Sequence, residues 1–263
     1  MTTNTSPTTF IHPITGKPCK LGRRPVRRNG RSRLRSAMMH KFLATVPPPT
    51  ANEAADNTFG ITAWGMMDND TLGDCTIACP GHLIQAWTAS SGSEVTVPDS
   101  VILSAYENWC GYVDGDSSTD QGGDILTVLQ DWQAKGLGGY SISSSAEIKV
   151  DEIRIQQGVY VFGGVNGGVE LPISAQSQVG GLWDVVGDGQ TGNSAPGSWG
   201  GHCTAIVGYD VDGVTLVTWG ALQQATWRFV MAYYDEMHAI ISPNWKGPIA
   251  VGQLTSDLQQ IGM

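Results

Sequence analysis

Residues 200–210 read GGHCTAIVGYD, and residues 213–220 read GVTLVTWG. Both runs combine β-branched, aromatic and small apolar residues, which favour strands, and the Val-Asp-Gly turn between them is typical of a hairpin. The two runs therefore predict a pair of antiparallel strands. His202 stands at the start of the first strand, directly after a Trp-Gly-Gly turn. From there its imidazole can face a helix across a cleft.

A helix that begins with a cysteine supplies a partner for this histidine. Residues 68–89 read DNDTLGDCTIACPGHLIQAWTA, in which Asp74 is a suitable N-cap and Cys75 opens the helix. The positive end of the helix dipole favours a thiolate at that position. A nucleophilic cysteine needs a histidine that is distant in sequence, and His82 lies two turns along the same helix, out of reach. Pro80 predicts a kink or a late helix start.

The rest of the chain predicts helices first and strands second. Amphipathic patterns predict helices at 101–110 and 125–136, and the run GVYVFGGV predicts a buried strand at 158–165. Residues 226–238 predict a further helix, and residues 239–242 predict a short strand. This order is typical of an α+β protein with two subdomains.

In the order and spacing of five short motifs, the sequence resembles the papain-like cysteine peptidases. Members carry a glutamine six residues before the nucleophilic cysteine, and Asn69 stands at that position. Their Gly-Gly pair before a helix corresponds to Gly122–Gly123, and their histidine strand to residues 200–210. Their Asn-Ser-Trp-Gly motif corresponds to VTWG at residues 217–220. The motifs extend over residues 64 to about 245.

The resemblance implies a papain-like α+β fold. Its helical half would cover about residues 64–140 and its antiparallel β half about residues 150–250, both within a domain at 51–263. Residues 1–50 would precede this domain as an extended basic arm. The proline run at 47–49 is typical of a stiff spacer and marks the boundary.

The resemblance also implies roles for individual residues. Cys75 would be the nucleophile, and His202 the general base and acid. Asn69 would form the oxyanion hole together with the backbone N–H of Cys75. Trp219 would shield the imidazole from water, and Thr218 and Gly122–Gly123 would support the cleft. The implied reaction is hydrolysis of a peptide or isopeptide bond through a Cys75 thioester, on a peptide such as a cell-wall cross-link, without cofactor or metal.

Three departures from the family pattern leave alternatives open. Val217 occupies the position of the histidine-orienting asparagine and cannot accept a hydrogen bond, so Thr218, Asp210 or a backbone carbonyl would have to replace it. Asn69 is one methylene shorter than glutamine, and Asp74 works against a thiolate next to it. Cys75 and His202 could instead be a buried apolar thiol and a hydrogen-bonded strand residue. The chain would then be an inactive papain-like scaffold with a structural role, for example in a virion.

The charges of the chain divide at the arm. The chain has 15 Lys and Arg and 24 Asp and Glu. Residues 1–50 hold ten of the basic residues and none of the acidic ones, so this segment carries +10, and residues 51–263 carry −19. Within the arm, residues 34–43 predict a short helix. Such an arm can fold back on its own body, bind an acidic neighbouring subunit, or contact nucleic acid. The scarcity of aromatic residues in it weighs against single-stranded nucleic acid.

Composition excludes several classes of protein. The 263 residues are 41% hydrophobic and contain nine Trp, which excludes a wholly disordered chain. The sequence contains no run of eighteen apolar residues, so it predicts no membrane span. The first ten residues lack the apolar core of a secretion signal, which predicts a cytoplasmic or virion-associated protein. The five cysteines include no C-x2-C pair, which predicts reduced thiols and no metal.

Overall fold

The computed structural model describes residues 10–50 and 53–262. The first nine residues of the predicted arm lie outside the described residues. The α-helices are α1 (Gly30–Leu43), α2 (Cys75–Ser90), α3 (Asp99–Cys110), α4 (Ile125–Lys135), α5 (Glu152–Phe162), α6 (Trp227–Tyr233) and α7 (Gly252–Ile261). In the described part of the chain, no helix is long and apolar enough to cross a lipid bilayer.

A single sheet forms the other half of the molecule. Its strands are β1 (Ala55–Asp56), β2 (Ser144–Ile148), β3 (Val165–Leu171), β4 (Leu182–Trp183), β5 (Gly200–Tyr209), β6 (Gly213–Thr218), β7 (Ala221–Thr226) and β8 (Tyr234–Ile241). The strand order is β2-β8-β3-β5-β6-β7-β4, with β1 paired to β5. All pairings are antiparallel except β4 with β7. The predicted α+β class and the β5–β6 hairpin are confirmed.

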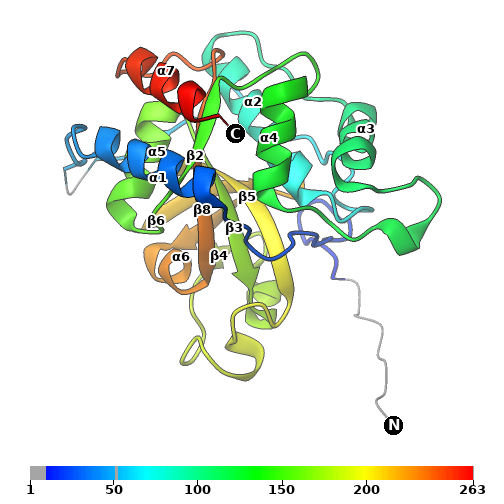
Figure 1. Ribbon diagram of the computed structural model, residues 1–263. Coiled ribbons are helices and arrows are strands. Elements are labelled where there is room, and N and C mark those ends of the chain that lie inside the picture. Colours follow the sequence, from blue (N-terminus) through cyan, green and yellow to red (C-terminus); the bar gives the residue numbers. More distant parts are fainter. Residues whose placement is uncertain (1–9, 51–52, 263) are drawn as a thin grey trace.

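Two apolar cores meet at β5. One core lies around α2, α3 and α4 and takes in Cys203, Ala205 and Val207 of β5. The other lies among the sheet, α1, α5, α6 and α7. Figure 1 shows α2, α3 and α4 on one side of the sheet's long strands. Because α2 packs directly on β5, the start of the helix is brought to the start of the strand.

The strand predicted at 158–165 is wrong for most of its length. Residues up to Phe162 belong to α5, and β3 begins only at Val165. Asp151 caps α5 by accepting the N–H of Arg154, and Gly163 ends it in a left-handed conformation at φ +74°. In this helix Gln156 and Gln157 are buried while Ile153 and Tyr160 are exposed, so the apolar residues do not mark the buried face. That is why the run reads as a buried strand.

The helix predicted at 226–238 is correct only in its first half. It ends at Tyr233, and Tyr234 begins β8, which pairs with both β2 and β3. Thr226 caps the helix by accepting the N–H of Phe229. The sequence favours a helix locally, but pairing with β2 and β3 satisfies the backbone hydrogen bonds of β8 on both edges and favours a strand.

The second half of the predicted arm is a helix that packs on the body. Asn29 forms a reciprocal capping box with Ser32 at the start of α1. Met39 and Leu43 of α1 are fully buried in the sheet-side core. Figure 1 shows α1 beside α5 and α7, and the preceding coil running from the sheet toward it. The helix is thus an integral part of the fold.

Among the described residues, Arg35 joins α1 to its surroundings through hydrogen bonds to carbonyl and hydroxyl oxygens. The buried guanidinium donates to the carbonyl oxygens of Ser145 (3.0 Å), Leu258 (2.8 Å) and Gly262 (2.9 Å), and to the hydroxyl of Ser144 (2.6 Å). Burial lowers its pKa to about 10. These bonds join α1 to β2 and to the end of α7.

We expect Arg35→Met to lower the free energy of unfolding by about 3 kcal/mol, because several buried carbonyl groups lose their donor. Chemical denaturation followed by circular dichroism measures the change. Arg33→Met, an exposed position on the same helix, is the control and should change stability by less than about 0.5 kcal/mol. Equal stability of the two variants would contradict this role of Arg35.

Candidate active site

The structure places Cys75 as the first residue of α2, where its side chain is buried. Its sulfur accepts backbone hydrogen bonds from Cys203 and Gly22. Cys203 directly follows His202 at the start of β5, so the thiol lies beside the histidine strand. Gly22 belongs to the arm. The thiol is therefore held between the body and a segment from far upstream in the chain.

His202 is fully buried and is held on two sides. Its Nε2 lies 2.6 Å from Oγ1 of Thr218 on β6. Its ring stacks on the indole of Trp219, with ring centroids 4.4 Å apart and planes 16° apart. Nδ1 of the imidazole is buried and makes no hydrogen bond with the described residues. Of the three replacements considered for the family's asparagine, the structure has Thr218 in contact with the imidazole, whereas Asp210 accepts backbone bonds in the β5–β6 turn.

The cysteine and the histidine are both neutral in this arrangement. Burial is the main cause that raises the pKa of Cys75 well above its usual value, with smaller contributions from Cys203 and Asp74. Burial also lowers the pKa of His202 to about 3, aided by the positive charge of Arg23. A thiol and a neutral imidazole are thus favoured over the ion pair that cysteine catalysis uses.

Asn69 is buried close to the start of α2, but its amide is already engaged. Its Nδ2 donates to the carbonyl oxygen of Leu72 (3.2 Å) and to the carboxyl group of Asp74 (3.1 Å). The amide therefore braces the turn before α2 and has its two donor hydrogens in use. Burial, together with Asp68, raises the pKa of Asp74, which favours a neutral carboxyl group. A neutral Asp74 would repel a Cys75 thiolate far less than a carboxylate would.

Residues 19–24 of the arm, named here the covering segment, run between the two sides of this site. On the helical side, the N–H of Gly123 donates to the carbonyl of Gly22 (2.9 Å), and the N–H of Arg24 donates to the carbonyl of Gly123 (2.8 Å). On the sheet side, Arg23 donates its N–H to the carbonyl of Gly201 (3.1 Å). The indole N–H of Trp219 donates to the carbonyl of residue 20 (2.9 Å). The segment thus bonds to both sides through its backbone.

Glycines let the covering segment approach this closely. A Cβ on Gly22 would overlap the backbone carbonyl of Gly73, and a Cβ on Gly122 would overlap the carbonyl of Gly22. Gly122 also has a φ of +71°, which favours glycine. The Gly-Gly pair singled out in the sequence therefore lies against the arm, where any side chain on Gly22 or Gly122 would separate the two backbones.

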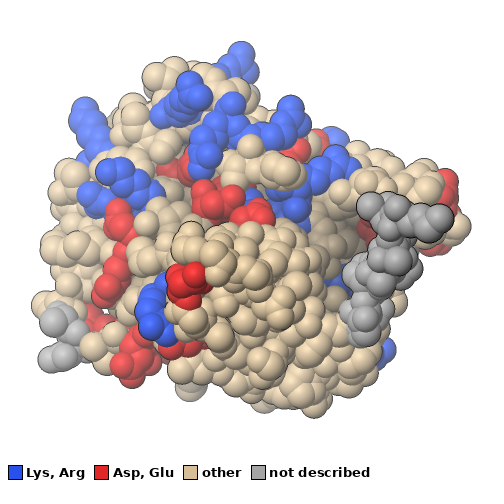
Figure 2. Space-filling model, turned by 90° about the horizontal axis from the view of Figure 1, so that it is seen from below, with Lys and Arg blue, Asp and Glu red and all other residues tan. Residues whose placement is uncertain are grey.

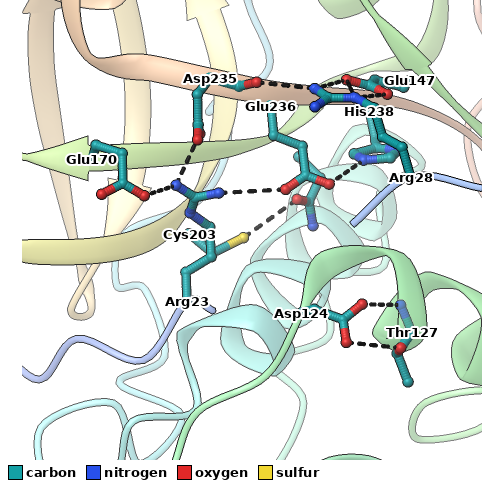
Figure 3. Close-up of polar contacts among 11 residues, drawn as sticks. Arg23, Arg28, Asp124, Thr127, Glu147, Glu170, Cys203, Asp235, Glu236 and His238 are labelled. Carbon is teal, nitrogen blue, oxygen red and sulfur yellow. Dashed lines mark hydrogen bonds and ion pairs between the residues drawn. The ribbon is translucent and has the colours of Figure 1, made fainter. Parts of the chain in front are cut away.

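Figure 3 shows the guanidinium of Arg23 surrounded by three carboxylates from β3 and β8. It contacts Glu170, lies 2.8 Å from the carboxylate of Asp235, and lies 3.4 Å from that of Glu236. The side chain of Arg23 is 0% exposed and that of Glu236 is 2% exposed. The other oxygen of Glu236 lies 2.8 Å from Nε2 of His238. Local sequence patterns cannot predict this cluster, because its four charged residues come from three distant segments of the chain.

Other basic residues of the arm also pair with acids of the body. Lys17 lies 3.3 Å from Asp70, and Arg27 lies 3.2 Å from Asp124. Arg28 contacts Glu147. Figure 2 shows Lys and Arg side chains gathered over one part of the surface, with Asp and Glu between them. In the described residues 10–50, the arm thus folds back on its own acidic body, the first of the three arrangements left open.

The geometry can be compared with known proteins. No known family profile matches the sequence, and no curated protein matches it. Solved structures do match. Xylellain, a cysteine protease from Xylella fastidiosa, is 14% identical, with a TM-score of 0.61 over 90% of this chain and 99% of its own. Procathepsin B from Trypanosoma congolense is 11% identical, with a TM-score of 0.50 over 85% of this chain and 86% of its own.

The chain therefore has the fold of the papain-like cysteine proteases. At these identities the likeness concerns the fold. Within the described part of the chain, no group of three His, Cys, Asp or Glu side chains could hold a metal ion.

Proposed function

We propose that the chain is a papain-like cysteine peptidase or amidase that folds in a closed, latent state. The observation that carries the proposal is the position of Cys75 at the start of α2, next to a strand on which His202 is held between Thr218 and Trp219. The thiol would attack a peptide or isopeptide carbonyl, and water would then hydrolyse the thioester.

The contacts of the imidazole support its role as the base. Thr218 occupies Nε2, so Nδ1 is the ring nitrogen left to accept the thiol proton and later to give it to the leaving amine. Stacking on Trp219 holds the plane of the ring. Since both amide hydrogens of Asn69 are used, the developing oxyanion would depend on backbone N–H groups at the start of α2.

Latency would follow from the covering segment. While it is in place, the thiol and imidazole are buried and neutral, so the sulfur is not exposed to a substrate carbonyl. Displacement of the segment would let water in, and the pKa values of Cys75 and His202 would return toward the range in which an ion pair forms. The arm would then regulate the site.

The proposal is tested in a chain whose covering segment is displaced by a substitution, named here the opened chain. Labelling of Cys75 and cleavage of peptides are the two measurements. Gly22→Val should displace the covering segment, because the added side chain overlaps the carbonyl of Gly73. A thiol-directed epoxide should then modify Cys75, found by peptide mapping, and a mixture of peptides should be cleaved. Cys75→Ala in the same opened chain should abolish both signals. An opened chain whose Cys75 reacts but which cleaves nothing would favour the inactive scaffold.

We expect Thr218→Val to lower kcat of the opened chain about tenfold with little change in KM. Valine has the shape of threonine but cannot bind Nε2, so the imidazole would lose its hydrogen-bonded orientation. Steady-state kinetics measure the split, and Thr215→Val on the same strand, which faces Gln224, is the control. A loss confined to KM would contradict the orienting role.

A further inference from the structure

The acidic site around Arg23 points to a subsite of the body that the arm fills. We propose that Glu170, Asp235 and Glu236 form a binding subsite for an arginine side chain of a peptide substrate, and that Arg23 occupies it as a stand-in. The inference rests on the proposed peptidase function and names the class of its substrate, an arginine-containing peptide.

The position of the subsite supports this assignment. The N–H of Gly22 faces the sulfur of Cys75, and Arg23 is the next residue. The backbone of Arg23 binds Gly201, which directly precedes His202. A peptide that reaches the thiol along this path places a side chain between β3 and β8. The three carboxylates thus lie where they can select one residue beside the attacked bond.

The shape of the subsite fits a guanidinium group. The two terminal nitrogens of Arg23 meet separate carboxylates, which a planar fork can do and an ammonium group does less well. Gly168 on β3 leaves room for the stem, because a Cβ there would lie 2.9 Å from Cδ of Arg23. Figure 3 shows the carboxylates converging on this one group from different sides.

The negative charges of the three carboxylates also favour a cationic side chain in the subsite. Glu236 is 2% exposed, and Glu170 and Asp235 are 34% and 40% exposed, so removal of Arg23 leaves one buried and two half-exposed carboxylates together. His238 contacts only the far oxygen of Glu236. Like charges this close destabilise one another, and a cationic side chain relieves the repulsion. A body opened by loss of the arm therefore retains a site that favours arginine.

The arm's own sequence, supplied as a separate peptide, tests the subsite without any need for turnover. The probe is fluorescein-labelled KLGRRPV, residues 20–26, added to the full chain that carries Gly22→Val and Cys75→Ala. We expect binding by fluorescence anisotropy, and a loss of at least about tenfold in affinity when the peptide carries Arg23→Gln. The matched peptide with Arg24→Gln should stay within about threefold, because that half-buried side chain donates to the carbonyl of Gln121 and forms no ion pair among the described residues.

A second experiment measures which peptides the chain cleaves. The chain with Gly22→Val alone is given a random peptide mixture, and the cleaved bonds are sequenced by mass spectrometry. We expect arginine to be enriched at one position, and Glu236→Gln to reduce the enrichment at least about fivefold. Arginine-dependent peptide binding without any cleavage would support the subsite and contradict the peptidase. Cleavage without basic preference, or equal binding of the two substituted peptides, would overturn the subsite and leave the peptidase intact.

Discussion

Replacing Gly22 with valine is expected to raise the rate at which iodoacetamide alkylates Cys75 by about 100-fold or more. The covering segment passes so close to Gly73 that a Cβ cannot be accommodated. If displacement relieves about 3 kcal/mol of overlap, the open population rises by about two powers of ten. The thiol would also lose the burial that raises its pKa. Timed alkylation followed by peptide mapping reads out Cys75 separately from the other four cysteines.

Gly30→Ala is the matched control for this substitution. It lies in the same half of the chain, and a Cβ there would meet nothing within 4 Å. In the Gly30→Ala chain, iodoacetamide should alkylate Cys75 at the same rate as in the unaltered chain. If valine at position 22 left the rate unchanged as well, the covering segment would not be what protects the thiol. The rate at Cys203, buried between β5 and α2, should stay low in all three chains and reports that the core is intact.

In the opened chain, His202→Gln should lower kcat for peptide cleavage by about a thousandfold, because the ring is the only base we place beside the thiol. The same variant should lose the ion pair, so alkylation of Cys75 at pH 6 should slow at least about tenfold. At pH 10 the two chains should react alike, since the thiol ionises there without help. Stopped-flow alkylation across this range measures the profile.

His40→Gln, on α1 and outside the site, is the control for the histidine substitution. It should leave both the turnover and the alkylation profile of the opened chain unchanged. An alkylation profile that did not differ between glutamine and histidine at position 202 would show that the imidazole does not ionise the thiol. The proposed catalytic pair would then be wrong, whatever the fold.

The elements that carry strong local signals were predictable from the sequence. The β5–β6 hairpin has a turn signal and alternating β-branched residues, and α3 and α4 have one apolar face each. The predictions failed where burial removes the pattern. Helix α5 buries Gln156 and Gln157 together with its apolar residues, and the run from 226 to 238 changes from helix to strand at Tyr234. Only the neighbouring strands, which are distant in sequence, decide such segments.

The candidate site divides in the same way. The spacing of motifs selects Cys75 and His202 as candidates, whose catalytic roles stay a prediction, and the contact of Thr218 with the ring is among the alternatives that the sequence offers. The engagement of Asn69 with Asp74 could not be read from sequence, because it depends on the turn before α2. Nor could the acidic subsite, whose members come from residue 23, β3 and β8. Charge composition predicted an attraction between arm and body but not which groups meet.

The anchoring of α1 by Arg35 has a kinetic consequence for any molecule that displaces the covering segment. Only residues 25–29 separate the segment from α1, so a released segment stays tethered at an effective concentration on the order of millimolar. Rebinding is then a unimolecular event, independent of how dilute the protein is. A free peptide that competes for the site has to be present at a concentration above this local value. One backbone cut within residues 25–29 would remove the tether, and the released covering segment could then diffuse away.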